Sequence, residues 1–205
     1  RKLKVMTVVG TRPEIIRLSR VLARLDEHCE HILVHTGQNY DYELNQVFFD
    51  DLDIRKPDYF LNSATDSKGA ANTIGNLISA VDEVLAQVQP EALLVLGDTN
   101  SCLSVIPAKR RRIPIFHMEA GNRCYDDRVP EEINRLVTDA ITNYFFTTSE
   151  VANEQLRRSG VDESRIHFVG NTMIDTLLKN RPRFKKPEVW DHVGLQEQGY
   201  LVMTL

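Results

Sequence analysis

The sequence predicts an α/β protein built on a doubly wound parallel sheet, and two observations support this. Short runs of apolar, often β-branched residues alternate along the chain with stretches whose apolar residues recur at the helical period. Strands that alternate with helices favour a parallel sheet covered by helices on both faces. Gly10, Gly97 and Gly170 each follow an apolar run, and the carboxyl ends of parallel strands are where such sheets bind their ligands.

The expected elements follow one another in strand and helix order. A first strand is expected at residues 3–9, and it is followed by a helix whose apolar positions run from Ile15 to Leu25. Further strands are expected at residues 32–34, 93–96, 113–117, 144–147 and 166–169. Further helices are expected at residues 42–49, 67–88, 100–111, 131–142, 150–158 and 172–178.

The composition changes after the last of these helices. Residues 180–187 contain two prolines among several basic residues, which is typical of a linker. The apolar run at residues 200–205 predicts a strand. We therefore expect a first domain over residues 1–178, a linker over 179–198, and the start of a truncated second domain at 199–205.

Composition excludes several classes of protein. The formal net charge of −4 is not basic enough to indicate a nucleic-acid partner, and the basic run at residues 109–112 is interpreted as solvated charge at a helix end. Cys29, Cys102 and Cys124 indicate neither a disulfide framework nor a zinc site. No apolar run approaches the roughly 20 residues of a membrane span. A cytoplasmic protein without a membrane or nucleic-acid partner is expected.

The loop after the first strand could bind an anion. Gly10, Arg12 and Pro13 stand at the start of a helix, where free N–H groups, the helix dipole and a guanidinium all favour phosphate. The alternative is a plain turn with Arg12 solvated or paired to Glu14. Neither G-x-G-x-x-G nor G-x-x-x-x-G-K-[ST] is present here, which counts against a dinucleotide cofactor and against an NTPase.

Three acidic residues are the candidates for catalysis. Asp98 and Glu119 follow two buried strands, and Glu131 begins a helix that carries Asn134 and Arg135 one turn further on. Each acid also has a structural alternative: Asp98 could cap the helix near Thr99, and Glu131 could complement the helix dipole, as we accept for Glu132. Clustered carboxylates raise one another's pKa values, so one can donate a proton while another accepts one.

Five motifs together resemble the non-hydrolysing UDP-N-acetylglucosamine 2-epimerase family, and the resemblance covers nearly the whole chain. The motifs lie at residues 10–14, 97–99, 117–121, 130–135 and 170–175. The resemblance implies the Rossmann-like N-terminal domain of a glycosyltransferase-B-type fold, in which two such domains enclose the active site. It also implies a UDP-sugar substrate and no metal or cofactor. We expect the protein to be a homodimer.

The resemblance also implies roles for individual residues. Asp98, Glu119 and Glu131 match the family's catalytic carboxylates, and Arg12 matches an arginine near the UDP. The residues expected to bind the UDP-sugar are Gly10, Arg12, Pro13, Asn134 and Arg135. The implied reaction is reversible inversion at C2 of UDP-GlcNAc to UDP-ManNAc, through elimination of UDP to a 2-acetamidoglycal and re-addition. A further family histidine would lie just after Leu205, and most uridine contacts belong to the second domain, so residues 1–205 alone are expected to be a poor catalyst.

Some segments depart from the family's main pattern. Arg17 stands where many members have lysine, and residues 38–41 differ from the loop tied to allosteric substrate binding. Residues 15–19, 35–44, 100–102 and 122–124 resemble the branch that forms UDP-N-acetyl-L-fucosamine, whereas residues 147–175 resemble the N-acetylglucosamine branch. The alternatives are therefore a C2 epimerase of a 6-deoxy sugar, a hydrolysing 2-epimerase, or a non-catalytic domain that binds nucleotide sugars.

Overall fold

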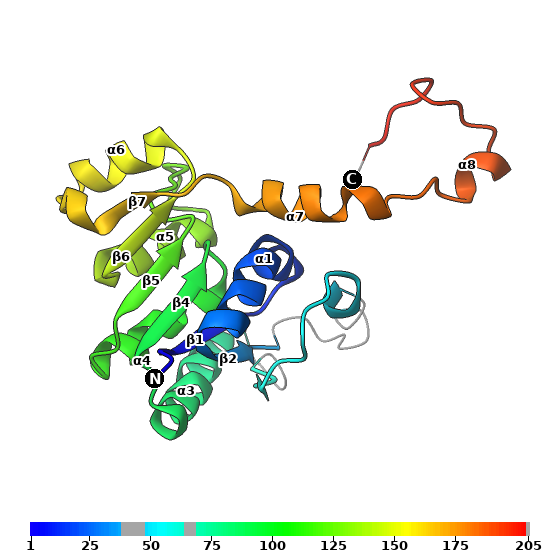
Figure 1. Ribbon diagram of the computed structural model, residues 1–205. Coiled ribbons are helices and arrows are strands. Elements are labelled where there is room, and N and C mark those ends of the chain that lie inside the picture. Colours follow the sequence, from blue (N-terminus) through cyan, green and yellow to red (C-terminus); the bar gives the residue numbers. More distant parts are fainter. Residues whose placement is uncertain (38–47, 64–68, 204–205) are drawn as a thin grey trace.

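The computed structural model describes residues 1–37, 48–63 and 69–203, and these form one parallel sheet with helices on both faces (Figure 1). Its strands are β1 (Lys4–Val9), β2 (Glu30–His35), β3 (Tyr59–Phe60), β4 (Ala92–Leu96), β5 (Ile115–Met118), β6 (Tyr144–Thr147) and β7 (Ile166–Phe168). The α-helices are α1 (Arg12–His28), α3 (Ala70–Val88), α4 (Val105–Arg110), α5 (Pro130–Ile141), α6 (Glu150–Arg158), α7 (Thr172–Asn180) and α8 (Val189–His192). Short 3₁₀ turns are η1 (Asn100–Ser104), η2 (Glu163–Arg165) and η3 (Arg181–Arg183).

The strand order is β3-β2-β1-β4-β5-β6-β7, and every pairing is parallel. The chain first winds outward from β1 to β3 and then returns to the other side of β1 to begin β4. This order confirms the predicted doubly wound sheet. The direction of winding reverses between β1 and β4, and Gly10 and Gly97 directly follow these two strands. The topological switch point, where such sheets bind ligands, therefore lies at the predicted site.

The two faces of the sheet are covered by different helices because side chains alternate along each strand. On one face, Leu18 and Leu22 of α1 pack against Leu33, Leu94 and neighbouring strand residues. On the other face, α3 and α4 cover a second cluster, which includes Met6, Val8, Leu77, Val81, Leu85, Leu93, Val95, Val105 and Ile115. Each fully buried side chain of this size contributes roughly 1.5–3 kcal/mol. These two clusters hold the strand ends in place.

Helix α7 packs on α1 through hydroxyl groups. Thr172 and Thr176 donate hydrogen bonds to the carbonyl oxygens of Arg17 and Ile16 at 2.9 Å, and Ser19 and Thr176 share a hydrogen bond of 2.8 Å. Small hydroxyl side chains let the two helices approach closely, and they satisfy their own polar atoms on the partner's backbone. The segment that follows α7 runs away from the sheet in Figure 1.

The structure corrects several sequence-based boundaries. Residues 200–203 form no strand, because no other described strand lies beside them to supply hydrogen bonds; residues 204–205 lie outside the described residues. The helix expected at 100–111 begins as the 3₁₀ turn η1 and becomes α-helical at Val105. The two-residue strand β3 was not predicted. Most of the helix expected at 42–49, and the first residues of the one expected at 67–88, lie outside the described residues.

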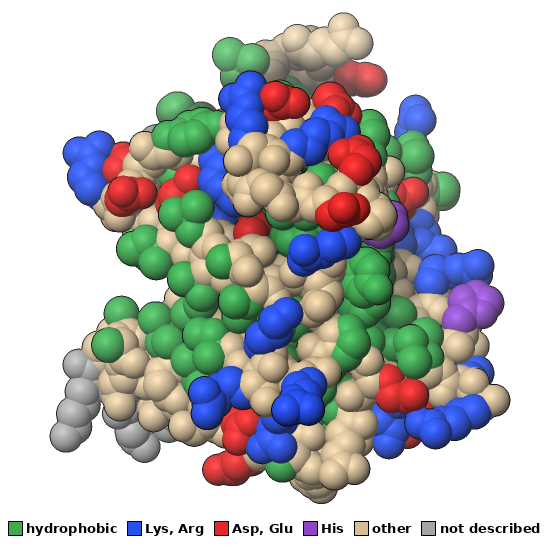
Figure 2. Space-filling model, turned by 90° about the vertical axis from the view of Figure 1, so that its left-hand side faces the viewer, with side chains coloured by type: hydrophobic (Ala, Val, Ile, Leu, Met, Phe, Trp, Pro, Cys, Tyr) green, Lys and Arg blue, Asp and Glu red, His purple; other side chains and the backbone are tan. Residues whose placement is uncertain are grey.

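One edge of the sheet exposes apolar side chains. Figure 2 views the β7 side of the molecule and shows hydrophobic side chains across the middle of that face, with charged groups of both signs around them. Phe168 and Val169 are exposed at this edge.

An apolar pocket of about 430 Å³ lies against α1 and the strands, and its lining includes Val21, Leu94 and Phe146. No helix among the described residues is long and apolar enough to cross a membrane.

The approach of α6 to the loop after β5 leads to a stability prediction. Gly121 has a φ of +79°, and a Cβ added there would lie 2.5 Å from the carbonyl oxygen of Ala152 in α6. Gly160 has a φ of +82° but open space around it. Gly160→Ala should therefore cost about 1–2 kcal/mol of unfolding free energy, the cost of a left-handed residue. Gly121→Ala should cost about 1–3 kcal/mol more because of the clash, as measured by urea unfolding. Equal losses would contradict this account of Gly121.

Candidate active site

The loop after β1 is organised by the buried carboxylate of Glu14. Its Oε2 accepts hydrogen bonds from the backbone N–H groups of Gly10 and Thr11, at 2.8 and 2.7 Å, and from the Thr11 hydroxyl. Its Oε1 accepts the Thr99 hydroxyl at 2.7 Å, which joins this loop to the loop after β4. Burial raises the pKa of Glu14, although these four donors oppose the shift. Glu14 therefore fixes the two sides of the switch point relative to each other.

The side chain of Asp98 is free from the capping role. Thr99 is the N-cap residue of η1, because its hydroxyl accepts a hydrogen bond from the Ser101 N–H. The structural alternative for Asp98 is therefore wrong. Its half-buried carboxylate instead forms an ion pair with Arg135 of α5.

Helix α5 also holds the backbone beside Asp98. Asn134 donates a hydrogen bond from Nδ2 to the carbonyl oxygen of Asp98 at 2.9 Å. Arg135 bridges Asp98 and Glu132, whose Oε2 lies 2.9 Å from Arg135 Nη1. Glu132 lies in the first helical turn as expected, but it is buried and also accepts the backbone N–H groups of Cys124 and Tyr125. It therefore anchors the loop before α5 as well as Arg135.

Glu119 directly follows β5 in an unusual backbone conformation. Its φ is +60°, in the left-handed region that costs a non-glycine residue of order 1–3 kcal/mol. Its carboxylate Oε2 accepts a hydrogen bond from Arg17 of α1 at 2.8 Å. Burial raises the pKa of Glu119; the charge of Arg17 opposes this shift, and the nearby charge of Asp98 adds to it. A Cβ added at Gly97 would lie 3.7 Å from Oε2 of Glu119, so the Glu119 carboxylate lies beside the turn that carries Asp98.

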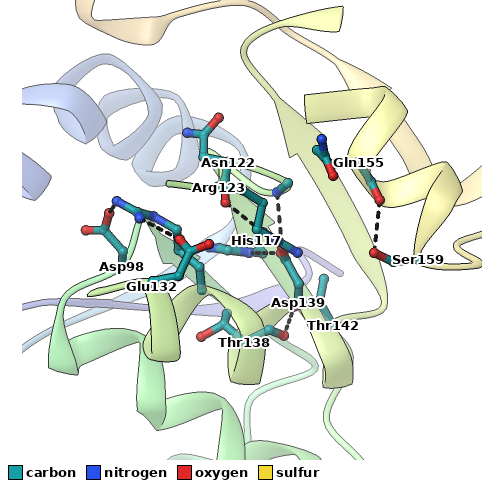
Figure 3. Close-up of polar contacts among 12 residues, drawn as sticks. Asp98, His117, Asn122, Arg123, Glu132, Thr138, Asp139, Thr142, Gln155 and Ser159 are labelled. Atoms are coloured by element: carbon teal, nitrogen blue, oxygen red, sulfur yellow. Dashed lines mark hydrogen bonds and ion pairs between the residues drawn. The ribbon is translucent and has the colours of Figure 1, made fainter. Parts of the chain in front are cut away.

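The bend at Glu119 is held on both sides by Asp139 of α5. Its carboxylate receives His117 Nδ1 at 2.8 Å, the Gly121 N–H at 3.1 Å and Arg123 Nη1 at 2.7 Å. Figure 3 shows His117 and Arg123 converging on Asp139, with Glu132 and then Asp98 lying to one side of them. Burial raises the pKa of Asp139, but the hydrogen bonds and charges of His117 and Arg123 outweigh it and hold the pKa below its ordinary value.

The other predicted site residues are less closely tied to this centre. Glu131 is exposed in the first turn of α5, and no hydrogen bond or ion pair joins it to Asp98 or Glu119 in the described part of the chain. Arg12 is exposed, with its guanidinium 5.8 Å from the centre of the Phe48 ring rather than paired to Glu14. Pro13 lies in the first turn of α1, as expected.

A small pocket opens at the switch point. It has a volume of about 240 Å³, and its lining includes Pro13, Glu14, Arg17, Gly97 and Asp98. Among the residues that the structure describes, no group of three or more acidic, cysteine or histidine side chains could hold a metal ion. The pocket therefore offers two carboxyl groups, Glu14 and Asp98, and one cation, Arg17, at the place where ligands bind in this architecture.

Sequence reasoning missed several residues that position the acids. Arg17 was noted only as a departure, Glu14 only as a partner for Arg12, and Asp139 was not considered. Arg135 and Asp139 are four residues apart in the sequence. Asp139 therefore lies on the same helix face as Arg135, and this position could have identified it as a second residue of the helix that contacts the loops after the strands.

The fold and the site together define a class of protein. A doubly wound sheet that places two carboxylates, each paired to an arginine, at its switch point is an α/β domain with an acid–base site. The family model described as UDP-N-acetylglucosamine 2-epimerase matches residues 23–205. The chain belongs to this family.

Similar proteins agree with the family model. A UDP-N-acetylglucosamine 2-epimerase homolog of Methanococcus maripaludis is 37% identical over 99% of this chain and 57% of its own length. The structure of UDP-N-acetylglucosamine 2-epimerase from Rickettsia bellii has a TM-score of 0.88 and 54% identity, over 96% of this chain and 52% of its own. The Methanocaldococcus jannaschii enzyme in complex with UDP-GlcNAc and UDP has a TM-score of 0.85 and 35% identity, over 93% and 53% of the two chains.

The fold likeness extends beyond close relatives. The structure of MurG from Acinetobacter baumannii has a TM-score of 0.57 at 10% identity over 82% of this chain and 45% of its own, which shows a shared fold alone. This agrees with the predicted glycosyltransferase-B-like, Rossmann-type domain. The chain spans about half the length of the relatives it matches.

The Arg17–Glu119 ion pair leads to a pH prediction. Arg17→Met removes the cation that opposes the effect of burial, so the pKa of Glu119 should rise further than in the native protein. A carboxyl whose pKa is raised by folding stabilises the fold below its unfolded pKa of about 4.3, and this stabilisation is lost as pH rises through the folded pKa. The variant should therefore lose more stability than the native protein between about pH 4 and neutrality.

The measurements for Arg17→Met are a carbon-13 NMR titration of the Glu119 carboxyl and urea unfolding across the same pH range. Arg128→Met is the control, because Arg128 pairs with Asp126 on the surface. A Glu119 titration that is the same in Arg17→Met and in the native protein would show that Arg17 does not set its pKa.

Proposed function

We propose that the protein carrying this chain is a UDP-N-acetylglucosamine 2-epimerase that interconverts UDP-GlcNAc and UDP-ManNAc. The observation that carries the proposal is the proximity of Asp98 and Glu119 at the switch point, where their environments differ. Glu119 is a desolvated carboxyl with a raised pKa beside Arg17, whereas Asp98 is paired with Arg135. A carboxylate paired with an arginine, with a desolvated carboxyl beside it, suits a reaction in which protons move between the enzyme and the sugar.

The chemistry requires more than one acid–base group. The C2 proton of an N-acetylated sugar is not next to a carbonyl and is barely acidic. In the proposed reaction one carboxylate takes the C2 proton while the C1–O bond to UDP breaks, and the electron pair of the C–H bond becomes the C1–C2 double bond of a 2-acetamidoglycal. A proton is then delivered to C2 from the opposite face, and the UDP oxygen adds back to C1. Positioned proton transfer contributes roughly 10²–10⁴-fold to rate.

The residues take different parts in this proposal. Asp98 and Glu131 are the acid–base candidates, and Glu119 supports them electrostatically or shares the proton transfer. Glu131 is exposed, so its carboxylate is accessible to a bound sugar.

In the proposed complex, the diphosphate does not bind to free backbone N–H groups at the start of α1. The Gly10 and Thr11 N–H groups already bind Glu14, so a diphosphate at this loop would be held by Arg12 and the helix dipole. Gly10 and Pro13 would shape the loop that faces the nucleotide. Asn134 and Arg135 would act through Asp98, which both contact.

The names of the relatives favour UDP-GlcNAc over the 6-deoxy sugar and over a hydrolysing or non-catalytic role. We further propose that the protein works without metal or cofactor and as a cytoplasmic homodimer. Three free cysteines suit a reducing compartment, and closed twofold dimers are the commonest soluble oligomers. The division at residues 178 and 198 into a first domain, a linker and the start of a second domain also remains part of the proposal.

The full-length protein incubated with UDP-GlcNAc in deuterated water tests this function. We expect UDP-ManNAc with deuterium at C2, because the proton that returns comes from solvent. Asp98→Asn should lower this exchange by about 10²–10⁴-fold. Asp82→Asn, which changes a surface carboxylate paired with Arg111, should leave it unchanged. Product without C2 deuterium would contradict the mechanism, and free sugar plus UDP as the end products would favour a hydrolysing enzyme.

A further inference from the structure

His117 of β5 is fully buried, and both of its ring nitrogens face protein oxygens. Nε2 lies 2.8 Å from the carbonyl oxygen of Gly97, and Nδ1 lies 2.8 Å from Oδ1 of Asp139. A backbone carbonyl oxygen can only accept a hydrogen bond. Nε2 of His117 must therefore carry a hydrogen atom to make the first of these contacts.

The second contact requires a hydrogen on Nδ1 as well. The other oxygen of Asp139 accepts the Gly121 N–H and the guanidinium of Arg123, so the carboxyl group is surrounded by donors. This arrangement favours the ionised carboxylate, in agreement with the lowered pKa of Asp139. Because an ionised carboxylate only accepts, Nδ1 of His117 is also the donor.

Two other buried histidines show what the alternative looks like. His31 also faces a carboxylate, Asp26, with Nδ1 at 2.6 Å, but its Nε2 lies 3.0 Å from the Thr7 hydroxyl, which can donate. Burial lowers the pKa of His31, despite the opposing effect of Asp26. His35 accepts the Gly37 N–H on Nδ1, and burial lowers its pKa to about 4. Both rings can therefore satisfy their contacts as neutral imidazoles, whereas His117 cannot.

The surroundings of His117 contain few other groups that titrate. Its neighbours in the sheet register are Val95 of β4 and Phe145 of β6, which carry no charge. On η1, burial raises the pKa of Cys102, and the charges of Asp139 and Glu119 add to this effect. Cys102 therefore remains a thiol. Asp139 and Arg123 lie on one side of the ring, and Glu119 follows two residues along the chain.

We propose that His117 is a positioning residue whose ring carries a hydrogen on both nitrogens, held in that state by the Asp139 carboxylate and the Gly97 carbonyl oxygen. Its bond to the Gly97 carbonyl fixes the turn that presents Asp98, and its charge stabilises the carboxylate of Glu119. Because both ring nitrogens are occupied, it transfers no proton in the reaction. This inference rests on the proposed epimerase function for its catalytic consequence, but the charge state of the ring does not depend on that function.

The charge state can be measured directly in the full-length protein labelled with nitrogen-15 histidine. At neutral pH, NMR should show a hydrogen on both ring nitrogens of His117 and on one ring nitrogen each of His31 and His35. The His117→Gln variant assigns its signals. Asp139→Asn should convert His117 to a neutral ring, because a buried imidazolium then lacks its counter-charge. A native His117 with one bare nitrogen would overturn the inference.

The catalytic consequence needs a control that breaks an equivalent pair elsewhere. Asp26→Asn alters the partly buried pair with His31 of β2, and Asp139→Asn alters the buried pair with His117 of β5. Asp139→Asn should lower kcat for C2 exchange by about 10²-fold with little change in KM, since small misplacements of catalytic groups cost that much. In the pH–rate profile, Asp139→Asn should also shift the transition caused by Glu119 to higher pH, because the positive charge of His117 is lost. Asp26→Asn should leave the pH–rate profile as in the native protein.

The outcomes separate the two claims. If Asp139→Asn and Asp26→Asn lower kcat equally and have the same pH–rate profile, the pair of His117 and Asp139 serves stability alone. If the native full-length protein exchanges no C2 hydrogen, the proposed function fails, and the nitrogen-15 measurement still decides the charge of His117.

Discussion

The carboxylate of Asp139 holds together the part of the chain on which the candidate site depends. It binds His117 on one side of Glu119 and both Gly121 and Arg123 on the other, so the strained residue between them has little freedom to relax. A left-handed non-glycine residue persists when its surroundings determine its conformation in this way. His117 carries the constraint across to the Gly97 carbonyl and hence to the turn that presents Asp98.

Helix α5 and helix α1 act as two supports for the same pair of acids. From α5, Asn134 and Arg135 hold the backbone and side chain of Asp98. From α1, Arg17 holds the side chain of Glu119, and Glu14 ties the loop after β1 to Thr99. The acids therefore keep different environments although they lie close together. That difference is what a reaction with one proton removed and another delivered requires.

Much of this arrangement could be predicted from the sequence, and the reasons are local. Strand and helix periodicity predicted the sheet, and the glycines after β1 and β4 placed Asp98 at the switch point. The supports could not be predicted in the same way. Asp139 binds three groups that lie 16 to 22 residues away, and Glu14 reaches Thr99 in another loop, so these partners depend on helix rotation and packing. The strand β3 was not predicted because two residues are too few to show the alternating pattern of a strand. The strand expected at 200–205 has no neighbouring strand among the described residues to pair with.

The central claim is that Asp139 fixes the geometry of Asp98 and Glu119 through His117 and the loop after β5. A high-resolution crystal structure of the full-length Asp139→Asn variant tests it most directly. The account predicts an unchanged sheet in which Glu119 leaves the left-handed region and the Gly97–Asp98 turn shifts away from His117. An unchanged backbone at Glu119, with the bond between His117 and the Gly97 carbonyl intact, would contradict it.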